Sequence, residues 1–597
     1  MSLRREYDVA TSPVLIPTSK IVSSRCATST RTRSHAPGTR GARTREPENA
    51  KVERKCERGD AEEPGAERTN LCSKSTHDTH CVELEIDTKM GMTNAQTNSE
   101  RAHDEAHSRG STIDAFFAGT VILLTGATGF LGKALLEKLL RSCPVAAIFV
   151  LIRPKRNKSI EQRFEELLND PVFDRIRSEF PGTLNKVFPV KGDVGMPELG
   201  LQPADRDMLL QSVNIVFHSA ATVRFNEPLK IAVNLNTMGT DRMLDLCRRM
   251  TNLISVIHVS TAYSNADRRE IEESIYITEV KPHTVVDMCE NLDDETLGII
   301  EKRLIGDHPN TYTLTKGLAE QIVMTKGRGL PIAIVRPSIV CAANQEPFPG
   351  WIDNACGITG IMTEISRGTV RSIVCDANLI VDIVPVDFVV NTLICASWHN
   401  FVQRTDTIKI YNCTSSTVHP ITWGEFGYLV RKHAIEAPSK YVMWYPGFTF
   451  RTNKFIHTII SATLHFLPAF IVDLILRVQG CEPIMLKLTK RFERAAKTGE
   501  FFATNEWKFY TDNMTKLVKF VSTQESCKSF DMNIKNMDWD MYLHQYMLGI
   551  RKYILKDSLD SLNNARRRLA KLYWMHECTK ILSIGFALLG MIKCAGR

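Results

Sequence analysis

A tyrosine and a lysine four residues apart could carry acid–base chemistry. Tyr312 and Lys316 lie in the segment YTLTK, and on a helix this spacing places both side chains on one face. A phenol has an ordinary pKa of about 10, so it is a poor acid–base group at neutral pH. A nearby cation would lower that pKa by stabilising the phenolate. We therefore predict that Tyr312 is the catalytic acid–base and that Lys316 assists it, although Tyr312 alone could be a core aromatic.

A hydroxyl group precedes this pair in the sequence. Ser260 and Thr261 directly follow an apolar run, and either could hold a substrate oxygen while negative charge develops on it. We favour Thr261 as the third catalytic residue and leave Ser260 as the alternative. The Tyr-x-x-x-Lys pattern is common by chance, and what sets this one apart is the nucleotide-binding loop that precedes it in the chain.

That loop is the strongest local signal. The stretch 120–141, TVILLTGATGFLGKALLEKLLR, is an apolar run, then Gly126-x-x-Gly129-x-x-Gly132, then an amphipathic segment. The three glycines permit a tight turn, a close backbone approach to a pyrophosphate, and close packing of helix on strand. The phosphates would meet free N–H groups and the positive end of the helix dipole. The alternative is a glycine-rich turn without a ligand. The residues predicted to bind the dinucleotide here are Gly126, Thr128, Gly129, Phe130, Leu131 and Gly132.

The segment after the second apolar run distinguishes NADPH from NADH. An NADH site usually has an Asp or Glu there, which holds the ribose 2′-hydroxyl. This chain has Arg153-Pro154-Lys155-Arg156 instead. Arg153 can donate two hydrogen bonds to a 2′-phosphate, and Lys155 or Arg156 can add positive charge. We therefore predict NADPH as the cofactor; the alternative is a solvated basic loop.

Further cofactor contacts are expected where other apolar runs end. Asp193 and Val194 follow the third run, where a carboxylate and an N–H group could hold the adenine amino edge. Asp193 could instead only cap a turn. Ala220 follows the fourth run, and its small side chain would let the cofactor lie close to the sheet. Lys316 can also hydrogen-bond the nicotinamide ribose.

These residues must be positioned by a parallel sheet. Short apolar runs alternate with amphipathic helical stretches such as 133–141 and 229–249, a pattern that indicates helices on both faces of parallel strands. The sequence predicts an α/β fold, a doubly wound parallel sheet of Rossmann type, followed by a smaller, mainly helical C-terminal domain and an apolar tail. The predicted strands are 120–125, 147–152, 187–190, 215–218, 255–259 and 332–335.

Composition limits the class of protein. The 597 residues carry 75 Lys and Arg against 67 Asp and Glu, and a net charge of +8 is too modest to indicate a nucleic-acid partner. The 16 cysteines show no metal-ligand spacing, so we predict no metal site, and several lie in apolar runs as reduced thiols of a cytosol-facing protein would. Residues 1–111 are polar and basic and are predicted to be a disordered extension; a mitochondrial presequence is the alternative for residues 1–45.

Two apolar segments indicate contact with a bilayer. Residues 455–476 are strongly apolar, but His457, His465, Pro468 and Asp473 interrupt them and weaken a membrane-spanning interpretation. The alternatives are a buried helical hairpin and a segment that dips into the bilayer. Residues 581–592 are too short for a full span and would form a short anchor or an in-plane helix. The division that we predict is 112–400 for the NADPH-binding domain, 401–499 for a connecting and substrate region, 500–576 for a helical domain and 577–597 for a membrane-associated tail.

Several segments together resemble one protein family. TGATGFLGKALLEKLL, LIRPKRN, VFHSAATVRFNEPLKIAVNLNTMGT, HVSTAYSN, YTLTK, RPSIV and PGWIDN occur in the order found in extended short-chain dehydrogenases/reductases, and more narrowly in the fatty acyl-CoA reductases. FFATNEWKF, MDWDMYLHQYMLGIRKYILKD and ARRRLAKLYW resemble that family's C-terminal domain. The resemblance covers the chain from about residue 118 onward and leaves residues 1–110 unexplained.

The resemblance implies a function and a location. A fatty acyl-CoA reductase converts a long-chain acyl-CoA to a primary alcohol in two hydride transfers from NADPH, with release of CoA. It implies an enzyme on an intracellular membrane, the endoplasmic reticulum or the peroxisome, with its catalytic domain facing the cytosol. Two alternatives stay open: a related reductase or epimerase acting on a sterol or nucleotide-sugar, and a non-catalytic membrane scaffold that kept the cofactor fold. The sequence leaves acyl chain length and oligomeric state undetermined.

Overall fold

Seven strands form one parallel sheet in the order β11-β7-β5-β4-β1-β2-β3. The computed structural model describes residues 112–595 apart from 156 and 279, so the predicted disordered extension, 1–111, and Arg156 lie outside the described residues. The strands are β1 Val121–Thr125, β2 Ala147–Ile152, β3 Val187–Lys191, β4 Ile215–His218, β5 Ser255–Val259, β7 Ile332–Pro337 and β11 Lys409–Cys413. The strand order reverses direction between β1 and β4, which opens a crevice at the carboxyl ends of these strands. The predicted doubly wound parallel sheet is confirmed.

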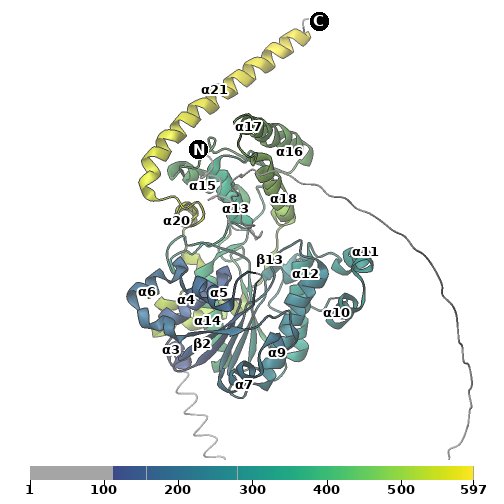
Figure 1. Ribbon diagram of the computed structural model, residues 1–597, viewed down its shortest axis with the longest axis vertical. Helices are drawn as coiled ribbons and strands as arrows, with labels where there is room; N and C mark the ends of the chain where they lie inside the picture. The colour runs from purple at the N-terminus through teal and green to yellow at the C-terminus, as the bar shows by residue number, and fades with distance from the viewer. Residues whose placement is uncertain (1–111, 156, 279, 596–597) are drawn as a thin grey trace, which may run out of the picture. The chain divides into compact units, whose positions relative to one another are not determined.

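Side chains alternate between the two faces of this sheet. Ile122 and Leu124 of β1 point into one hydrophobic core, whereas Leu123 points into the other. Because both faces are covered, central strands such as β1 and β2 are almost entirely apolar rather than alternating with polar residues. Figure 1 shows the helices on either side of the sheet. One face carries α4 Phe130–Ser142, α5 Ile160–Leu168 and α14 Val386–Val402, and the other carries α7 Pro203–Ser212, α9 Met238–Arg249 and α12 Thr311–Lys326.

Shorter elements surround the sheet. Three two-stranded parallel pairs lie outside it: β6 Glu270–Ile271 with β13 Lys508–Phe509, β8 Ile339–Cys341 with β10 Ile383–Pro385, and β9 Ser372–Val374 with β12 Thr449–Arg451. The remaining α-helices of the sheet region are α3 Ile113–Phe117, α6 Asp174–Glu179, α8 Leu229–Ala232, α10 Pro282–Asn291, α11 Asp294–Ile305 and α13 Gly357–Arg367. Between α8 and α9, the π-helical turn Val233–Thr237 interrupts the regular helix.

The C-terminal helices pack onto the same core as the sheet. Leu517 of α19 and Tyr546 of α20 are fully buried in the hydrophobic cluster that also contains Ile122 of β1. The Tyr546 hydroxyl lies 2.7 Å from Thr359 Oγ1 of α13. These contacts join segments about 190 residues apart in the sequence. The helices after the sheet are α15 Trp423–Glu436, α16 Lys454–Ile460, α17 Leu467–Val478, α18 Met485–Ala503, α19 Asp512–Ser522, α20 Trp539–Gly549 and α21 Leu562–Ala595.

A long apolar helix lies between α15 and α18. Among the described residues, Lys454–Val478 is the single helix that is long and apolar enough to cross a membrane. Two of its polar residues face the protein: His465 Nε2 accepts a hydrogen bond from the Arg371 N–H at 2.9 Å, and Asp473 accepts from the N–H groups of Met485 and Leu486 at the start of α18. Its apolar residues, such as Phe470 and Leu474, are half exposed. The helix is therefore held to the protein along one side and apolar on the other.

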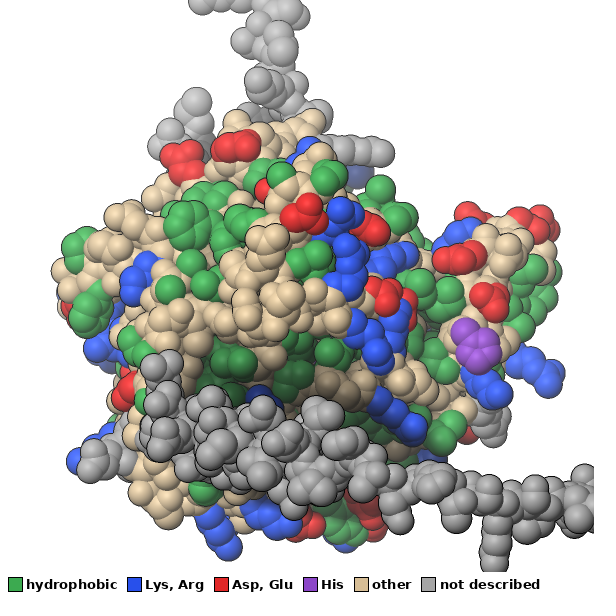
Figure 2. All heavy atoms as spheres, turned by 90° about the horizontal axis from the view of Figure 1, so that it is seen from below, with side chains coloured by type: hydrophobic (Ala, Val, Ile, Leu, Met, Phe, Trp, Pro, Cys, Tyr) green, Lys and Arg blue, Asp and Glu red, His purple; other side chains and the backbone are tan. Residues whose placement is uncertain are grey.

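Figure 2 shows a face on which side chains of different kinds are mixed. Lys and Arg side chains form a short band, and acidic side chains lie beside it. Hydrophobic side chains lie in several small groups on the same face. The positive charges on this face are therefore partly balanced by their neighbours.

Candidate active site

The glycine loop joins β1 to α4 with no room for side chains. Gly126 has φ +78°, and a Cβ atom there would lie 2.9 Å from the backbone nitrogen of Ala220. A Cβ atom on Gly132 would collide with the carbonyl oxygen of Gly126. No side chain caps the first turn of α4, which begins after Gly129. The loop therefore leaves a helix N-terminus and bare backbone for the phosphates of a dinucleotide.

The start of α4 is fixed from its other side. The Phe130 ring stacks on the buried Trp351, with ring centroids 5.1 Å apart. Lys133 pairs with Asp170 at 2.7 Å and with Asp353 at 3.2 Å. Leu131 packs against the first core. Aromatic stacking and two ion pairs thus hold the helix in place before any ligand binds.

A threonine hydroxyl positions the bend after β4. Thr125 Oγ1 accepts hydrogen bonds from the N–H groups of Ser219 and Ala220 at 3.2 and 3.1 Å, and it lies 2.9 Å from His218 Nδ1. Burial lowers the pKa of His218 to about 3, so this imidazole is neutral. These contacts hold Ala220 against Gly126, as its predicted place beside the cofactor requires.

Three cations gather beside the glycine loop. Arg163 of α5 donates to the carbonyl oxygen of Arg153 and, at 3.2 Å, to Thr128 Oγ1. Burial and then the positive charge of Arg153 lower the pKa of Arg163. Burial and then Arg163 and Arg153 lower the pKa of Lys155. Mutually repelling cations held beside a phosphate-binding loop form a site that an anion would stabilise. Arg163 was not among the predicted site residues, because no local sequence pattern indicates that its side chain turns back toward the glycine loop.

Asp193 and Val194 lie at the same edge of the sheet, directly after β3. Asp193 Oδ1 accepts a hydrogen bond from the Gly195 N–H at 3.0 Å, which is the turn cap considered from the sequence. Val194 is buried, and its carbonyl oxygen accepts from Arg242 at 2.9 Å. The turn is thus built by its own residues, and adenine binding by Asp193 and Val194 stays a prediction.

The three predicted catalytic residues come together at the carboxyl edge. Helix α12 begins after Asn310, whose side chain accepts from the Thr313 N–H at 2.9 Å, so Tyr312 and Lys316 fall on its first two turns. Lys316 is 3% exposed, and its ammonium donates to the carbonyl oxygen of Val259 at 2.7 Å. Thr261 follows the same strand, β5. The helix and the strand thus present the phenol, the ammonium and the hydroxyl together.

Burial has the largest effect on the pKa values of Tyr312 and Lys316. It raises the pKa of Tyr312 to about 12, and the hydrogen bond with Thr261 opposes that rise. Burial lowers the pKa of Lys316 to about 8, and Glu320 opposes that shift. The sequence led us to expect a lowered pKa for Tyr312. The protein's own groups give the reverse, because burial of the phenol outweighs the hydrogen bond with Thr261.

Ser260 belongs to a buried polar network behind the site. Its hydroxyl donates to Glu320 Oε1 at 2.5 Å, and Glu320 pairs with Arg336 at 2.6 Å. Glu320 and Arg336 are 1% and 0% exposed. Thr261 makes longer contacts, 3.4 Å to the Pro337 carbonyl oxygen and 3.3 Å from the Tyr263 N–H. The geometry therefore favours Thr261 over Ser260 as the hydroxyl available to a substrate.

The chain matches known proteins over most of its length. Residues 124–393 and 464–557 match two family models, each described as "Male sterility protein". Fatty acyl-CoA reductase 1 of Gallus gallus is 41% identical over 462 residues, which cover 77% of this chain and 90% of the relative. Fatty acyl-CoA reductase 2 of Homo sapiens is 37% identical over 467 residues, with 78% and 90% covered. This chain belongs to the fatty acyl-CoA reductase family.

Two solved reductase domains align with this chain at low sequence identity. The reductase domain of a nonribosomal peptide synthetase from Mycobacterium tuberculosis aligns with a TM-score of 0.49 at 17% identity, covering 76% of this chain and 96% of that one. The terminal R domain of the myxalamid biosynthetic pathway aligns with a TM-score of 0.48 at 19% identity, covering 72% and 90%. Family membership and the glycine loop together support a nicotinamide cofactor in this oxidoreductase.

Phe225 and Phe502 form an aromatic wall beside Tyr312 that the sequence does not predict. The Phe225 ring stacks on Tyr312 with centroids 6.0 Å apart, and Phe502 lies 5.3 Å from Phe225. Phe502 also meets Tyr263 edge to face at 5.1 Å. Phe502 lies on the last turn of α18, about 190 residues after Tyr312. Such a contact depends on the tertiary fold of the chain, and no local pattern in the sequence indicates it.

Proposed function

We propose that this protein reduces a long-chain fatty acyl-CoA to a primary fatty alcohol, using NADPH and releasing CoA. The observation that supports the proposal is the contact of Tyr312 with Thr261 and of Lys316 with Val259 at the end of β5, in the sheet that also carries the glycine loop, in a chain of the fatty acyl-CoA reductase family. A phosphate-binding loop alone would serve many activities. A phenol and a hydroxyl beside it are what carbonyl reduction requires.

The roles of these residues follow from their chemistry. The cofactor, when bound, supplies hydride to the carbonyl carbon. Thr261 and Tyr312 hydrogen-bond the carbonyl oxygen, stabilise the charge that develops there, and Tyr312 transfers a proton to it. The resulting hemithioacetal loses its C–S bond, so that CoA leaves as a thiol and an aldehyde remains. The same residues protonate the aldehyde oxygen in a second reduction, which gives the alcohol. Lys316 holds the nicotinamide ribose.

The cations beside the loop support NADPH rather than NADH. Arg153 is exposed, and the pKa values of Arg163 and Lys155 are lowered first by burial and then by the positive charges beside them. A ribose 2′-phosphate would relieve this repulsion, whereas a 2′-hydroxyl would not. We also propose that Asp193 and Val194 hold the adenine and that Ala220 lies against the cofactor.

The substrate and the membrane would meet on the C-terminal side of the chain. We propose that the acyl chain passes the aromatic wall of Phe225 and Phe502, and that residues 401–499 connect the NADPH-binding domain, 112–400, to the helical domain, 500–576. The exposed apolar face of Lys454–Val478 and the tail 577–597 would contact the bilayer. The membrane would be that of the endoplasmic reticulum or peroxisome, with the catalytic domain in the cytosol.

A product assay tests the proposal. Membranes containing the full chain would be incubated with NADPH and a panel of long-chain acyl-CoA substrates, and products would be identified by gas chromatography. Fatty alcohol from the wild type, and none from the Tyr312→Phe variant, is the expected result. Aldehyde without alcohol would restrict the reaction to one hydride transfer. No product and no thiol release from a folded protein that binds NADPH would overturn the proposal.

A further inference from the structure

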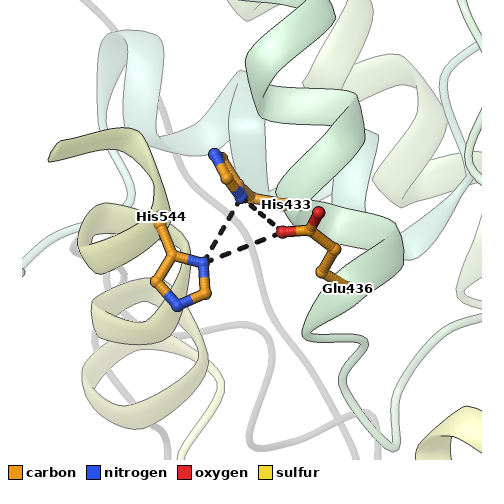
Figure 3. A group of neighbouring side chains, drawn as sticks. All are labelled: His433, Glu436 and His544. Atoms are coloured by element: carbon orange, nitrogen blue, oxygen red, sulfur yellow. Dashed lines mark hydrogen bonds and ion pairs between the residues drawn. The ribbon is translucent and has the colours of Figure 1, made fainter. Parts of the chain in front are cut away.

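Three side chains outside the active site direct potential metal ligands toward one point. His433 and Glu436 lie on the last turn of α15, and His544 lies on α20. Figure 3 shows the two imidazoles and the carboxylate converging from these helices. Their nearest ligand atoms all lie within 4.8 Å of one another. The helices thus bring together residues separated by more than 100 positions in the sequence.

The spacing of the ligand atoms suits an ion with tetrahedral coordination. His433 Nδ1 lies 2.8 Å from Glu436 Oε2 and 3.3 Å from His544 Nδ1, and His544 Nδ1 lies 4.0 Å from Glu436 Oε2. Zinc binds imidazole nitrogen and carboxylate oxygen at about 2.0–2.2 Å, which places adjacent tetrahedral ligands about 3.3 Å apart. The three distances bracket that value. Small side-chain rotations would equalise them.

A carboxylate supports the most buried of these ligands from behind. His433 Nε2 lies 2.9 Å from Asp540 Oδ1, and both carboxylate oxygens of Asp540 lie 2.8 Å from the ammonium of Lys432. A metal-binding histidine commonly donates its second ring N–H to a carboxylate, which fixes the tautomer and the direction of the ring. Here that arrangement leaves the Nδ1 lone pair of His433 directed toward Glu436 and His544.

The same atoms compete for protons when no metal is present. An imidazolium at His433 could donate to both Asp540 and Glu436, but its Nδ1 would then carry a proton and could not accept from His544. One cation that accepts lone pairs from all three groups satisfies them together. Two imidazoles and one carboxylate favour zinc over magnesium or calcium, which prefer oxygen ligands.

We propose that His433, Glu436 and His544 bind one Zn²⁺ ion, with Asp540 as a positioning residue and water in the fourth position. The site clamps α15 to α20. An ion can reach it, because Glu436 is 47% and His544 is 35% exposed, whereas His433 is only 3% exposed and fixes the inner side. The sequence did not indicate this site, because a His and a Glu three residues apart are too short a pattern to be specific. The third ligand, His544, lies more than 100 residues further along the chain.

Metal binding by the purified full chain tests this proposal. The protein would carry no histidine tag, would be stripped with a chelator, and would be titrated with Zn²⁺ against a chromophoric competitor. We expect one tight equivalent in the wild type, at least 100-fold weaker binding in His544→Ala and Glu436→Gln, and 10- to 100-fold weaker binding in Asp540→Asn. His283→Ala is the matched control, because His283 is exposed on α10, away from these ligands.

Two further readouts separate metal binding from a structural role. Zn²⁺ should raise the thermal midpoint of the wild type and of His283→Ala but not that of His544→Ala. Co²⁺ in place of zinc should give the visible absorption of a four-coordinate ion, absent from Glu436→Gln, whose half-exposed side chain can change without unfolding the helix. Absence of a tight equivalent in the wild type, or equal binding by His544→Ala and the wild type, would overturn the proposal. Neither result bears on acyl-CoA reduction.

Discussion

Two regions of the molecule depart in opposite ways from the usual pattern of buried apolar and exposed charged side chains. They are the carboxyl edge of the sheet and the helix Lys454–Val478. At the sheet edge, charged groups are enclosed: Lys316, Glu320 and Arg336 are at most 3% exposed. On the helix, large apolar groups are open: Phe455 is 74% and Val478 is 83% exposed. Burying a charge costs free energy unless it is paired, and leaving a wide apolar face in water costs free energy as well.

The two regions offset these free-energy costs in different ways. The enclosed charges find partners within the protein, through the Glu320–Arg336 pair and the Lys316–Val259 hydrogen bond. The apolar face of the helix lies away from His465 and Asp473, whose hydrogen bonds fasten the helix to the protein, and its large side chains are exposed. We infer that the first region is arranged for chemistry and the second for lipid.

The largest effect belongs to the Tyr312 hydroxyl. Tyr312→Phe should lower kcat/KM by about 10²- to 10⁴-fold, because a positioned acid–base group contributes that much. The loss should be similar for acyl-CoA and for an added fatty aldehyde, since one site serves both reductions. NADPH binding should be unchanged. Tyr428→Phe, which alters an exposed tyrosine, is the control; an equal loss in that variant would remove Tyr312 from its catalytic role.

Cofactor choice should depend on the cations beside the loop. Arg153→Ala should weaken NADPH binding by about 10- to 100-fold, because a hydrogen bond between charged groups contributes about 1.5–3 kcal/mol. NADH binding should stay the same. Arg175→Ala, at an exposed arginine paired with Glu179, should change neither affinity. Fluorescence titration with both cofactors measures this, and a matched loss of NADH affinity would refute 2′-phosphate recognition by Arg153.

Membrane binding should depend on the exposed face of the long helix. The double variant Ile471→Lys and Leu474→Lys should lower binding of the full chain to phospholipid vesicles by about tenfold or more, since each apolar side chain contributes about 1.5–3 kcal/mol when buried. Both positions are about half exposed, so the fold should tolerate the change. Ile299→Lys, at an exposed isoleucine of α11, is the control. Unchanged flotation of the double variant would show that this face does not meet lipid.

The smallest effect is a pH dependence of cofactor affinity. Burial lowers the pKa of Lys316 to about 8, so its ammonium is present below that pH and is lost as the pH rises through it. NADPH affinity should therefore fall by about fivefold above pH 8, as a charged hydrogen bond becomes a neutral one. Lys316→Arg keeps its charge and should show no such fall. A parallel decline in both proteins would assign the titration to another group.

Much of the sheet could be predicted because its signals are local. The apolar run Val121–Thr125 and the glycines after it define strand, turn and helix by their own spacing, and the structure reproduces them. Strand β11, Lys409–Cys413, was not predicted, because KIYNC mixes polar and apolar residues and lies beyond the expected end of the domain at residue 400. Its assignment to the sheet depends on pairing with β7.

Other features depend on contacts that no local pattern encodes. Arg163, Phe502 and His544 each reach their partners across the fold. The histidines and the aspartate inside the apolar segment 455–476 weaken a membrane-spanning interpretation of the sequence, and in the structure His465 and Asp473 fasten the helix to the protein while its apolar side is exposed. The roles of the site residues and the domain division stay predictions.

The stoichiometry of a single reaction tests the central claim most directly. With purified protein, NADPH and one long-chain acyl-CoA, NADPH oxidation, thiol release and alcohol formation would be followed in the same sample. We predict two NADPH oxidised and one alcohol formed for each CoA released, with no accumulated aldehyde. One NADPH per CoA with free aldehyde as the final product, or NADPH oxidation without thiol release, would contradict a single site that performs both reductions of an acyl-CoA.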